Sequence, residues 1–486
     1  MNLENCKAKT VWRLFGELSD IPRPSKHEQR VCEWLEKFAE RHDLAHRRDE
    51  EGNMVLVVPA TEGCEGSDGI VLQSHTDMVC EKTPESSHDF FKDGIRLVEK
   101  EGWMYADQTT LGADNGIGVA MALATATELK EPHGRIELLF TVDEETGLTG
   151  VNALQDEFIQ GTRLINLDSE DEGVLTIGCA GGIQSDLTLG IEREKIADGQ
   201  TIACITIAKL KGGHSGVNII EQRANAIVLL GRVLGSLGQA FEIRLGDITG
   251  GSAANAIPRD AAATFVFDQK NLSSANEILK SAAAEIKTQF AQTDPDLSIT
   301  MEQMPSETID RVTTTPSSAV VVDLLNALPD GVHRMSKKMA GIVETSSNVA
   351  GVRVNPDRDE FIVTMTQRSL SDASLEYLTS RIEAASRLAG AAASRCRQYP
   401  SWQPRWDSPL LSTCKQVYEQ QSTRPATVEV IHAGLECAVI GKKYRDLDMI
   451  SIGPTIEDPH SPKERVNIES VDQVWDFLKA LIVRLK

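Results

Sequence analysis

Several features that mark particular classes of protein are missing from this sequence. No window of the 486 residues approaches the roughly 18 consecutive apolar residues of a transmembrane helix, so we expect no membrane span. The N-terminal residues lack a long apolar stretch and a small-residue cleavage site, so we expect no secretory signal. The nine cysteines include no Cys-x-x-Cys pair. Such a scattered set favours reduced thiols in a cytoplasmic protein.

Positive charge is also in short supply. Lys and Arg number 50 against 72 Asp and Glu, which gives a formal net charge of −22. This charge repels phosphate backbones, so we expect no nucleic-acid partner, although a small substrate responds to local charge instead. The 41% of hydrophobic and 25% of charged residues are ordinary for a globular protein and exclude collagen, coiled coil and wholesale disorder. The length favours two or three domains.

The first part of the chain alternates between strand-like and helix-like patterns. Ser25 and Glu28 have the spacing of a capping box, which predicts the start of a helix. The small, Ala-rich stretch 116–129 predicts another helix. Short apolar runs bounded by Gly and polar clusters predict buried strands at 54–58, 70–73, 136–142 and 164–167. This alternation indicates an α/β region with a largely parallel sheet.

The pattern changes after the glycine-rich stretch 178–182. Strands and amphipathic helices then interleave, with a helix expected over 219–237 and a strand over 241–245, and they indicate an α+β region. From about residue 400 the chain returns to alternating helix and strand. The sequence therefore predicts one α/β domain that is interrupted by a long insertion.

Acidic or imidazole groups follow apolar runs or lie in a Gly-rich loop in five segments: 73–78, 110–116, 142–147, 166–170 and 453–462. In an α/β sheet the carboxyl ends of the strands line the functional crevice, so these groups are expected to converge. Each segment alone has an ordinary explanation, since a single histidine is usually hydrogen-bonded, a Glu-Glu pair solvated and Asp-Asn-Gly a turn. Together, two histidines and at least three carboxylates without a suitably spaced cysteine favour a catalytic centre with an N- and O-ligated divalent metal.

The sequence resembles the M20 family of metallopeptidases, and within it the aminoacyl-histidine dipeptidase branch. The matching strings are S-H-T-D-M at 74–78, T-T-L-G-A-D-N-G-I-G at 109–118, E-E-T-G at 144–147, L-D-S-E at 167–170, G-C-A-G-G at 178–182, K-G-G-H-S-G at 211–216, N-A-I-P-R at 255–259, H-A-G-L-E-C at 432–437 and G-P-T-I-x-x-P-H-S-P at 453–462. They run through nearly the whole chain in the family's order. The resemblance implies a discontinuous two-domain α/β metallopeptidase with catalytic parts at 1–183 and 399–486 and an inserted α+β lid domain at 184–398.

The resemblance also implies two divalent metal ions per chain. His75 and Asp168 would hold one ion, Glu145 and His460 the other, and Asp114 would bridge them. Zinc is the expected metal, with cobalt and manganese as alternatives, because N/O sites accept all three according to supply.

Two further carboxylates take catalytic roles in the family pattern. Asp77 would orient the imidazole of His75, and Glu144 would act as the general base. The peptide bond between Asp114 and Asn115 would be cis. All seven family positions of the centre carry the expected residue type.

The inserted domain is expected to supply substrate-binding residues. His214 would stabilise the oxyanion from the lid, and Asn255 and Arg368 would hold the C-terminal carboxylate of the substrate. The sequence departs slightly from the pattern at Gly250–Ala254, where small residues precede Asn255.

The expected reaction is hydrolysis of unblocked dipeptides, both Xaa-His and others, by a water that two metals activate. The partner is therefore a small peptide, and a homodimer is one quaternary state to test. Another M20 activity, such as removal of an N-acyl group from an amino acid or a one-residue carboxypeptidase, is the alternative within enzymes. A non-catalytic binding paralogue is the alternative from a different class, and it predicts losses among the seven positions that this sequence does not show.

Overall fold

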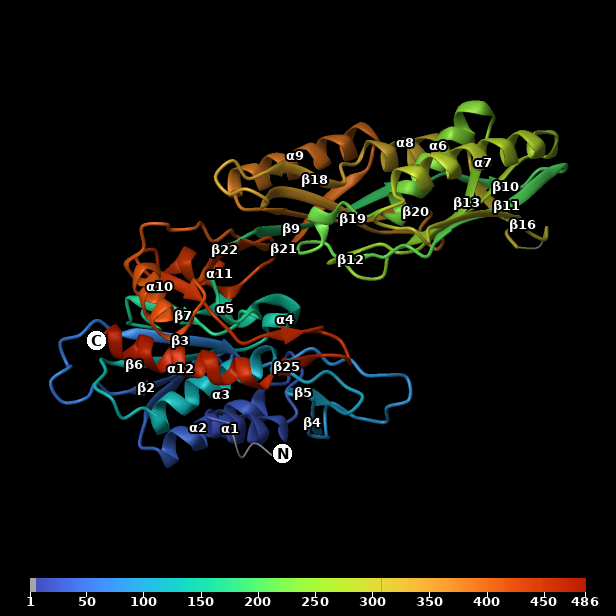
Figure 1. Ribbon diagram of the computed structural model, residues 1–486. Helices are drawn as coiled ribbons and strands as arrows, with labels where there is room; N and C mark the ends of the chain where they lie inside the picture. Colours follow the sequence, from blue (N-terminus) through green and yellow to red (C-terminus); the bar gives the residue numbers. More distant parts are fainter. Residues whose placement is uncertain (1–5, 307) are drawn as a thin grey trace. The chain divides into compact units, whose positions relative to one another are not determined.

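The computed structural model describes residues 6–306 and 308–486, and the chain divides into two compact units (Figure 1). Unit 1 contains the chain up to Cys179 together with Trp402–Val430 and Leu435–Lys486. Unit 2 contains Ala180–Ser401 and the short segment Ile431–Gly434. The expected fold class, α/β with an inserted α+β domain, is confirmed. The roles of catalytic domain and lid remain predictions at this point.

Unit 1 is built on an eight-stranded mixed sheet. Its strands, in spatial order, are β1 (Ala45–Arg48), β2 (Met54–Val58), β6 (Ile136–Thr141), β3 (Ile70–His75), β7 (Arg163–Asn166), β23 (Asp448–Ser451), β8 (Val174–Cys179) and β22 (Thr427–Ile431). The four strands from β6 to β23 run parallel, whereas β1, β2 and β8 pair antiparallel with their neighbours. The expectation of a largely parallel sheet therefore holds for the centre, where β3 and β6 are buried along their whole length.

Helices and a small second sheet complete unit 1. The helices are α1 (Lys9–Ser19), α2 (Gln29–Arg41), α3 (Ala113–Glu128), α4 (Glu144–Gly147), α5 (Thr149–Ala153), α10 (Pro409–Gln421), α11 (Glu436–Lys443) and α12 (Ile468–Arg484). The second sheet has the order β24 (Ile456–Glu457), β25 (Arg465–Asn467), β5 (Trp103–Ala106) and β4 (Leu97–Lys100).

Helix α3 packs unusually closely because its side chains are small. A Cβ atom at Gly118 would lie 2.7 Å from the carbonyl oxygen of Leu167, which leaves space for glycine alone. The first turn of α3 thus approaches the segment that follows β7. Asp114 and Asp168 are brought together in this way.

Unit 2 is built on a nine-stranded antiparallel sheet that helices cover. The strand order is β16 (Ser298–Gln303), β11 (Gln200–Ala208), β15 (Ala261–Asp268), β13 (Arg244–Gly250), β19 (Val343–Asn355), β20 (Glu360–Ser369), β9 (Gly181–Gly190) and β21 (Ala392–Tyr399), with β18 (Gly331–Met335) paired to β19. The four helices lie on one face of the sheet (Figure 1): α6 (Ala226–Ala240), α7 (Leu272–Gln289), α8 (Thr315–Ala327) and α9 (Asp372–Leu388). Their apolar sides and the sheet share one continuous hydrophobic core.

Short pairings complete unit 2. The two-stranded sheets pair β10 (Arg193–Lys195) with β17 (Arg311–Thr313) and β12 (Gly213–His214) with β14 (Ala256–Ile257), and the 3-10 turns are η1 (Ile219–Glu221) and η2 (Gln269–Asn271). Across residues 6–306 and 308–486, the structure has no helix with the length and apolarity that crossing a membrane requires. All nine cysteines are free.

The capping box expected at Ser25 and Glu28 is wrong. Glu28 itself is the N-cap of α2 and makes no side-chain cap hydrogen bond. Its carboxylate instead accepts the backbone N–H groups of Lys26 (2.8 Å) and Asp143 (2.9 Å), and Ser25 donates to Asp77 at 2.7 Å. Contacts with distant segments therefore override the local capping signal.

The helix expected over 219–237 is also wrong in its first part. A 3-10 turn ends at Glu221, the next residue, Gln222, has a left-handed φ of 52°, and α6 begins only at Ala226. The side chain of Asn225 caps α6 by accepting the backbone N–H groups of Ile227 and Val228. The helix continues to Ala240, so the strand expected over 241–245 is displaced to Arg244–Gly250.

Candidate metal centre

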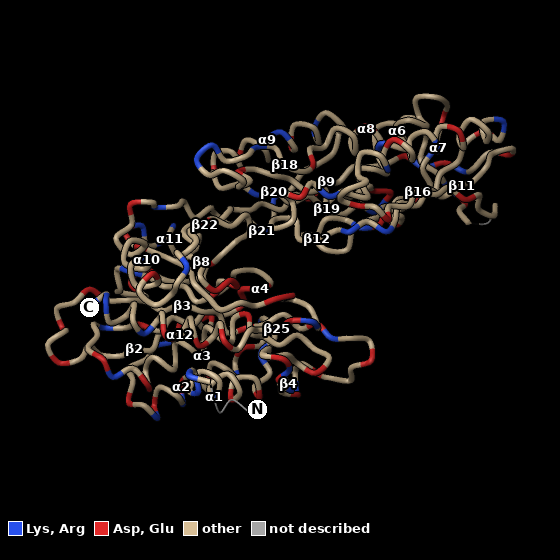
Figure 2. The backbone as a smooth tube through the Cα atoms, viewed as in Figure 1, with Lys and Arg blue, Asp and Glu red and all other residues tan. Residues whose placement is uncertain are grey.

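The carboxyl ends of three parallel strands bring the first acidic and imidazole groups together. Strands β6, β3 and β7 are neighbours, so their ends lie at the same edge of the sheet. His75 is the last residue of β3, and Asp168 follows the end of β7. Glu144 and Glu145 begin α4 directly after β6, where Figure 2 shows a concentration of acidic residues.

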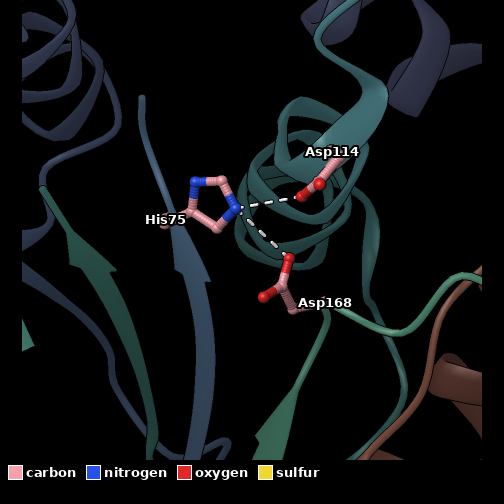
Figure 3. A group of neighbouring side chains, drawn as sticks. All are labelled: His75, Asp114 and Asp168. Atoms are coloured by element: carbon pink, nitrogen blue, oxygen red, sulfur yellow. Dashed lines mark hydrogen bonds and ion pairs between the residues drawn. The ribbon is translucent and has the colours of Figure 1, made fainter. Parts of the chain in front are cut away.

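Asp114 lies at the middle of the cluster and faces two histidines with its two oxygens. Its Oδ1 lies 3.0 Å from Nε2 of His75, and its Oδ2 lies 3.0 Å from Nε2 of His460. Figure 3 shows the first of these contacts, with Asp114 projecting from the start of α3 toward the imidazole at the end of β3. A carboxylate held in this way can bridge two ligand sites.

Each histidine has a second carboxylate partner. Nε2 of His75 lies 3.3 Å from Oδ1 of Asp168, as Figure 3 shows, and Nε2 of His460 lies 3.0 Å from Oε2 of Glu145. Three sets of potential ligand atoms each fall within 4.8 Å: His75 with Asp114 and Asp168, Asp114 with Glu145 and His460, and His75 with Glu144 and Glu145. The five residues proposed from the sequence as metal ligands therefore gather in unit 1.

The donor set and its charge fit divalent cations. Five carboxylates meet here, namely those of Asp77, Asp114, Glu144, Glu145 and Asp168. A buried group of like charges requires compensating positive charge. One carboxylate oxygen, Oε1 of Glu145, is buried and lacks a hydrogen-bond partner among the described residues. Imidazole and carboxylate ligands suit Zn, Co or Mn, so these residues fit such ions.

The histidines respond to this negative charge. Burial acts to lower the pKa of His75, but the carboxylates of Asp168 and Asp114 outweigh burial and hold it well above its usual value. Burial likewise acts to lower the pKa of His460, whereas Asp114 and Glu145 raise it to about 12. The carboxylates of the cluster thus favour the protonated form of both imidazoles.

The carboxylates respond to burial and to one another. Burial, together with the neighbouring Asp114, raises the pKa of Glu145 to about 7. Burial and the charge of Glu145 raise the pKa of Glu144 well above its ordinary value. Glu144 therefore lies in an environment that raises its proton affinity, as is common for groups that transfer protons.

Asp77 contacts both the imidazole of His75 and the backbone of the glutamate pair. Its Oδ1 lies 3.2 Å from Nδ1 of His75, on the side of the ring opposite Asp114. Its two oxygens also accept the backbone N–H groups of Glu144 (3.0 Å) and Glu145 (3.2 Å). One buried carboxylate therefore fixes both the imidazole and the glutamate pair.

Two buried residues that the sequence analysis did not single out hold the loop that carries Asp114. Arg23 donates to the carbonyl oxygens of Thr76 (3.0 Å), Asp77 (2.9 Å) and Gly112 (2.6 Å). Glu464 accepts four consecutive backbone N–H groups, from Leu111 to Asp114, at 2.7 to 3.3 Å. The peptide bond between Asp114 and Asn115 is cis, as the resemblance implies.

The residues expected to bind substrate gather within unit 2. Nε2 of His214 lies 3.5 Å from Nη2 of Arg368, and Nη1 of Arg368 donates to the Tyr399 hydroxyl at 2.8 Å. The backbone oxygen of Asn255 accepts from Ser215 at 2.7 Å, next to His214. Tyr399 was not identified from the sequence, because a tyrosine ahead of a proline carries no functional signal of its own.

Comparison with protein families gives one match that spans most of the chain. The model of peptidase family M20/M25/M40 matches residues 71–484. The cytosol non-specific dipeptidase of Escherichia coli is 37% identical over 480 residues, which cover 99% of this chain and 98% of that protein.

Solved structures agree with this relationship. The aminoacylhistidine dipeptidase of Vibrio alginolyticus matches with a TM-score of 0.85 and 37% identity, over 99% of this chain and 98% of that one. Aminopeptidase PepT from Bacillus cereus matches with a TM-score of 0.56 and 18% identity, over 99% of both chains, and shows the fold alone.

Proposed function

Because the chain belongs to peptidase family M20/M25/M40, we propose that it is a metal-dependent dipeptidase that hydrolyses unblocked dipeptides, Xaa-His among them. The observation that carries this proposal is the arrangement around Asp114, whose two oxygens face His75 and His460 at 3.0 Å each. The two relatives with 37% identity, which are named as dipeptidases, support the same substrate class.

The cluster in unit 1 would hold two divalent ions, zinc in the first instance and cobalt or manganese as alternatives. His75 and Asp168 would hold one ion and Glu145 and His460 the other, and Asp114 would contribute to both sets. When bound, such a pair of ions lowers the pKa of a water molecule and polarises the scissile carbonyl group. Asp77 keeps Nε2 of His75 directed at the centre by facing its Nδ1.

Glu144 acts as the general base. Its neighbour Glu145 contacts His460, whereas Glu144 has its backbone fixed by Asp77 and its carboxylate within reach of the His75 group of ligand atoms. Its raised pKa suits a group that takes the proton from the attacking water and passes it to the leaving amine.

Unit 2 supplies binding groups in this proposal. The backbone N–H of Val217 donates to Nδ1 of His214 at 3.1 Å and fixes the orientation of the ring, while Nε2 lies 3.5 Å from a guanidinium nitrogen of Arg368. In this proposal His214 stabilises the oxyanion through its Nε2 edge. Arg368, with Asn255, binds the C-terminal carboxylate of the dipeptide, for which a planar guanidinium is suited.

Substrate profiling tests the proposed specificity. A panel of Xaa-His dipeptides, other dipeptides, tripeptides and N-acyl amino acids is offered to protein reloaded with Zn, Co or Mn. We expect free dipeptides to be cleaved fastest. Faster turnover of N-acyl amino acids would identify a deacylase, and faster release of C-terminal residues from longer peptides would identify a carboxypeptidase.

The quaternary state and location belong to the same proposal. We expect each active site to be built from one chain, so that mixing His214→Ala with Glu144→Gln protein restores no activity. Recovered turnover would instead show that a homodimer shares its histidines. We propose a cytoplasmic location, in line with the word cytosol in the name of the Escherichia coli relative.

A further inference from the structure

A buried carboxyl group lies next to the metal cluster without belonging to it. Glu436 is the first residue of α11 and is fully buried, with 0% of the residue exposed. Its Oε2 accepts hydrogen bonds from Nε2 of Gln73 at 2.6 Å and from the hydroxyl of Thr141 at 2.7 Å. Gln73 precedes His75 on β3 by two positions, and Thr141 ends β6 just before Glu144.

These contacts continue as a row of polar side chains across the sheet. Oε1 of Gln73 accepts from the amide of Asn166 at 2.6 Å. Asn166 accepts in turn from the backbone N–H of Asp168 (3.3 Å) and from the hydroxyl of Ser451 on β23. The row therefore joins four adjacent strands at the point where three of them deliver residues to the cluster.

Such a row is unusual at this position. The central strands of a parallel sheet are covered on both faces and normally carry apolar side chains. Gln73, Thr141, Asn166 and Ser451 each have 0% exposure. Burying them costs free energy unless each is hydrogen-bonded, so a row of this kind favours a function over simple packing.

We propose that Glu436 is a positioning residue of the metal centre, which fixes the ends of β3 and β6 through Gln73 and Thr141 and so sets the separation of His75 from the Glu144–Glu145 pair. Because side chains two residues apart on a strand point to the same face, the orientation of Gln73 is tied to that of His75. This inference rests on the proposed function, since it assumes that the cluster binds metal.

The hydrogen bonds, rather than the charge, carry this role. Only Oε2 of Glu436 is engaged, while Oε1 makes no hydrogen bond to any part of the chain that the structure describes. An amide oxygen can accept the same two donors. Glu436→Gln should therefore retain the position of the strand ends, whereas Glu436→Met removes the acceptor at similar volume.

A matched control lies at the other end of β6. Glu137 is also fully buried, and it accepts from the backbone N–H groups of Gln160 (2.6 Å) and Gly161 (2.9 Å). Glu137→Met removes a buried carboxylate that also accepts two backbone hydrogen bonds, and one more from Arg135 at 2.8 Å, but leaves the residues of the cluster untouched. It reports the effect of lost stability alone.

The experiment measures zinc affinity by competition with a chromophoric chelator, together with kcat and KM, at a temperature where every variant is folded. We expect Glu436→Met to lose about 10–100-fold in zinc affinity and to lower kcat more than it changes KM. Glu436→Gln and Glu137→Met should stay within about threefold of the unmodified protein, the usual span of a weak perturbation below 1 kcal/mol.

Three results would overturn the inference. Glu436→Met with unchanged zinc affinity would show that the row does not position ligands. An equal loss in Glu137→Met would trace the effect to stability. A full loss in Glu436→Gln would mean that charge matters instead of the hydrogen bonds. Zinc affinity is measured without a substrate and therefore does not depend on the proposed dipeptidase activity. If that activity is wrong, the unmodified protein binds zinc but does not cleave dipeptides.

Discussion

Each unit buries a histidine, and the charged groups that surround the two histidines differ in sign. His75 in unit 1 and His432 in unit 2 are 1% and 8% exposed. The carboxylates of Asp168 and Asp114 overcome burial and raise the pKa of His75, whereas burial and the guanidinium of Arg368 lower that of His432 to about 3. Burial alone would keep both imidazoles neutral. The contrast shows that unit 1 surrounds its imidazole with carboxylates, a donor set that suits cations, whereas unit 2 places a guanidinium beside its imidazole, a group that suits anions.

The largest effect is expected from removing the Asp114 carboxylate, which concentrates negative charge beside the histidines of unit 1. Asp114→Ala deletes the side chain that faces both His75 and His460. We expect the protein to lose bound metal and all measurable dipeptidase activity while it stays folded. Metal analysis, activity and circular dichroism check this, and an active variant with its full metal content would refute the bridging role.

Removing the base should separate chemistry from metal binding. Glu144→Gln keeps the size of the side chain and, since Glu144 is not a proposed ligand, should keep both metals. We expect kcat to fall by about 10²–10⁴, the usual contribution of a general base. Steady-state kinetics and metal analysis on the same sample test this prediction. Loss of metal from the variant would show that Glu144, and not Glu145, is the metal ligand of the pair.

The groups of unit 2 should affect turnover without affecting metal. His214→Ala is expected to retain both ions and to lose about 10²–10³ in kcat, the cost of one oxyanion donor. Near-normal turnover would exclude His214 from catalysis. Ion content measured beside kcat distinguishes a lost donor from a damaged fold.

If Arg368 binds the C-terminal carboxylate of the substrate, its substitution should change KM instead of kcat, and by a smaller factor. Arg368→Lys retains the positive charge but loses the planar pair of donors. We expect KM to rise about tenfold, which corresponds to about 1.4 kcal/mol, with little change in kcat. Arg395→Lys, which alters an exposed contact of unit 2 with Glu376 and Glu383, is the matched control and should leave both constants unchanged.

The prediction with the smallest effect concerns pH and stability. The folded pKa of His432 is about 3, below the ordinary 6.5. Below pH 6.5 the His432 imidazole is protonated in the unfolded chain but stays neutral in the folded chain until the pH approaches 3. His432 therefore lowers the free energy of unfolding as the pH falls toward 3. The loss reaches about 2 kcal/mol at pH 5. Unfolding of the protein and of His432→Gln at pH 8 and pH 5 measures it, and equal pH dependence in the two would contradict the assignment.

The sequence predicts the cluster well because each member follows a recognisable strand. His75 ends the buried strand β3, Glu144 and Asp168 follow the buried strands β6 and β7 within three residues, and parallel neighbours bring these strand ends together. The supporting residues have no such signal. Glu464 bonds to backbone groups about 350 positions earlier in the chain, and Arg23 to carbonyl oxygens of two other loops. Because every residue except proline has the same backbone groups, a side chain that bonds to a distant backbone cannot be recognised from the sequence.

Tertiary contacts also explain the two helix starts that differ from the predicted ones. Ser25 and Glu28 have the spacing of a cap, yet they bond to Asp77 and Asp143 across the fold. Asn225, inside a helical apolar pattern, is the true cap of α6. Local preferences amount to about 1 kcal/mol per cap, so tertiary contacts decide where they compete.

The metal content of the protein tests the central claim most directly. The protein is exhaustively chelated, assayed, and then titrated with Zn, Co or Mn while bound metal and dipeptide hydrolysis are followed together. We predict no activity in the metal-free protein and full recovery as bound metal approaches two ions per chain. Full activity after chelation, or full recovery with one ion per chain, would contradict a dinuclear centre bridged by Asp114.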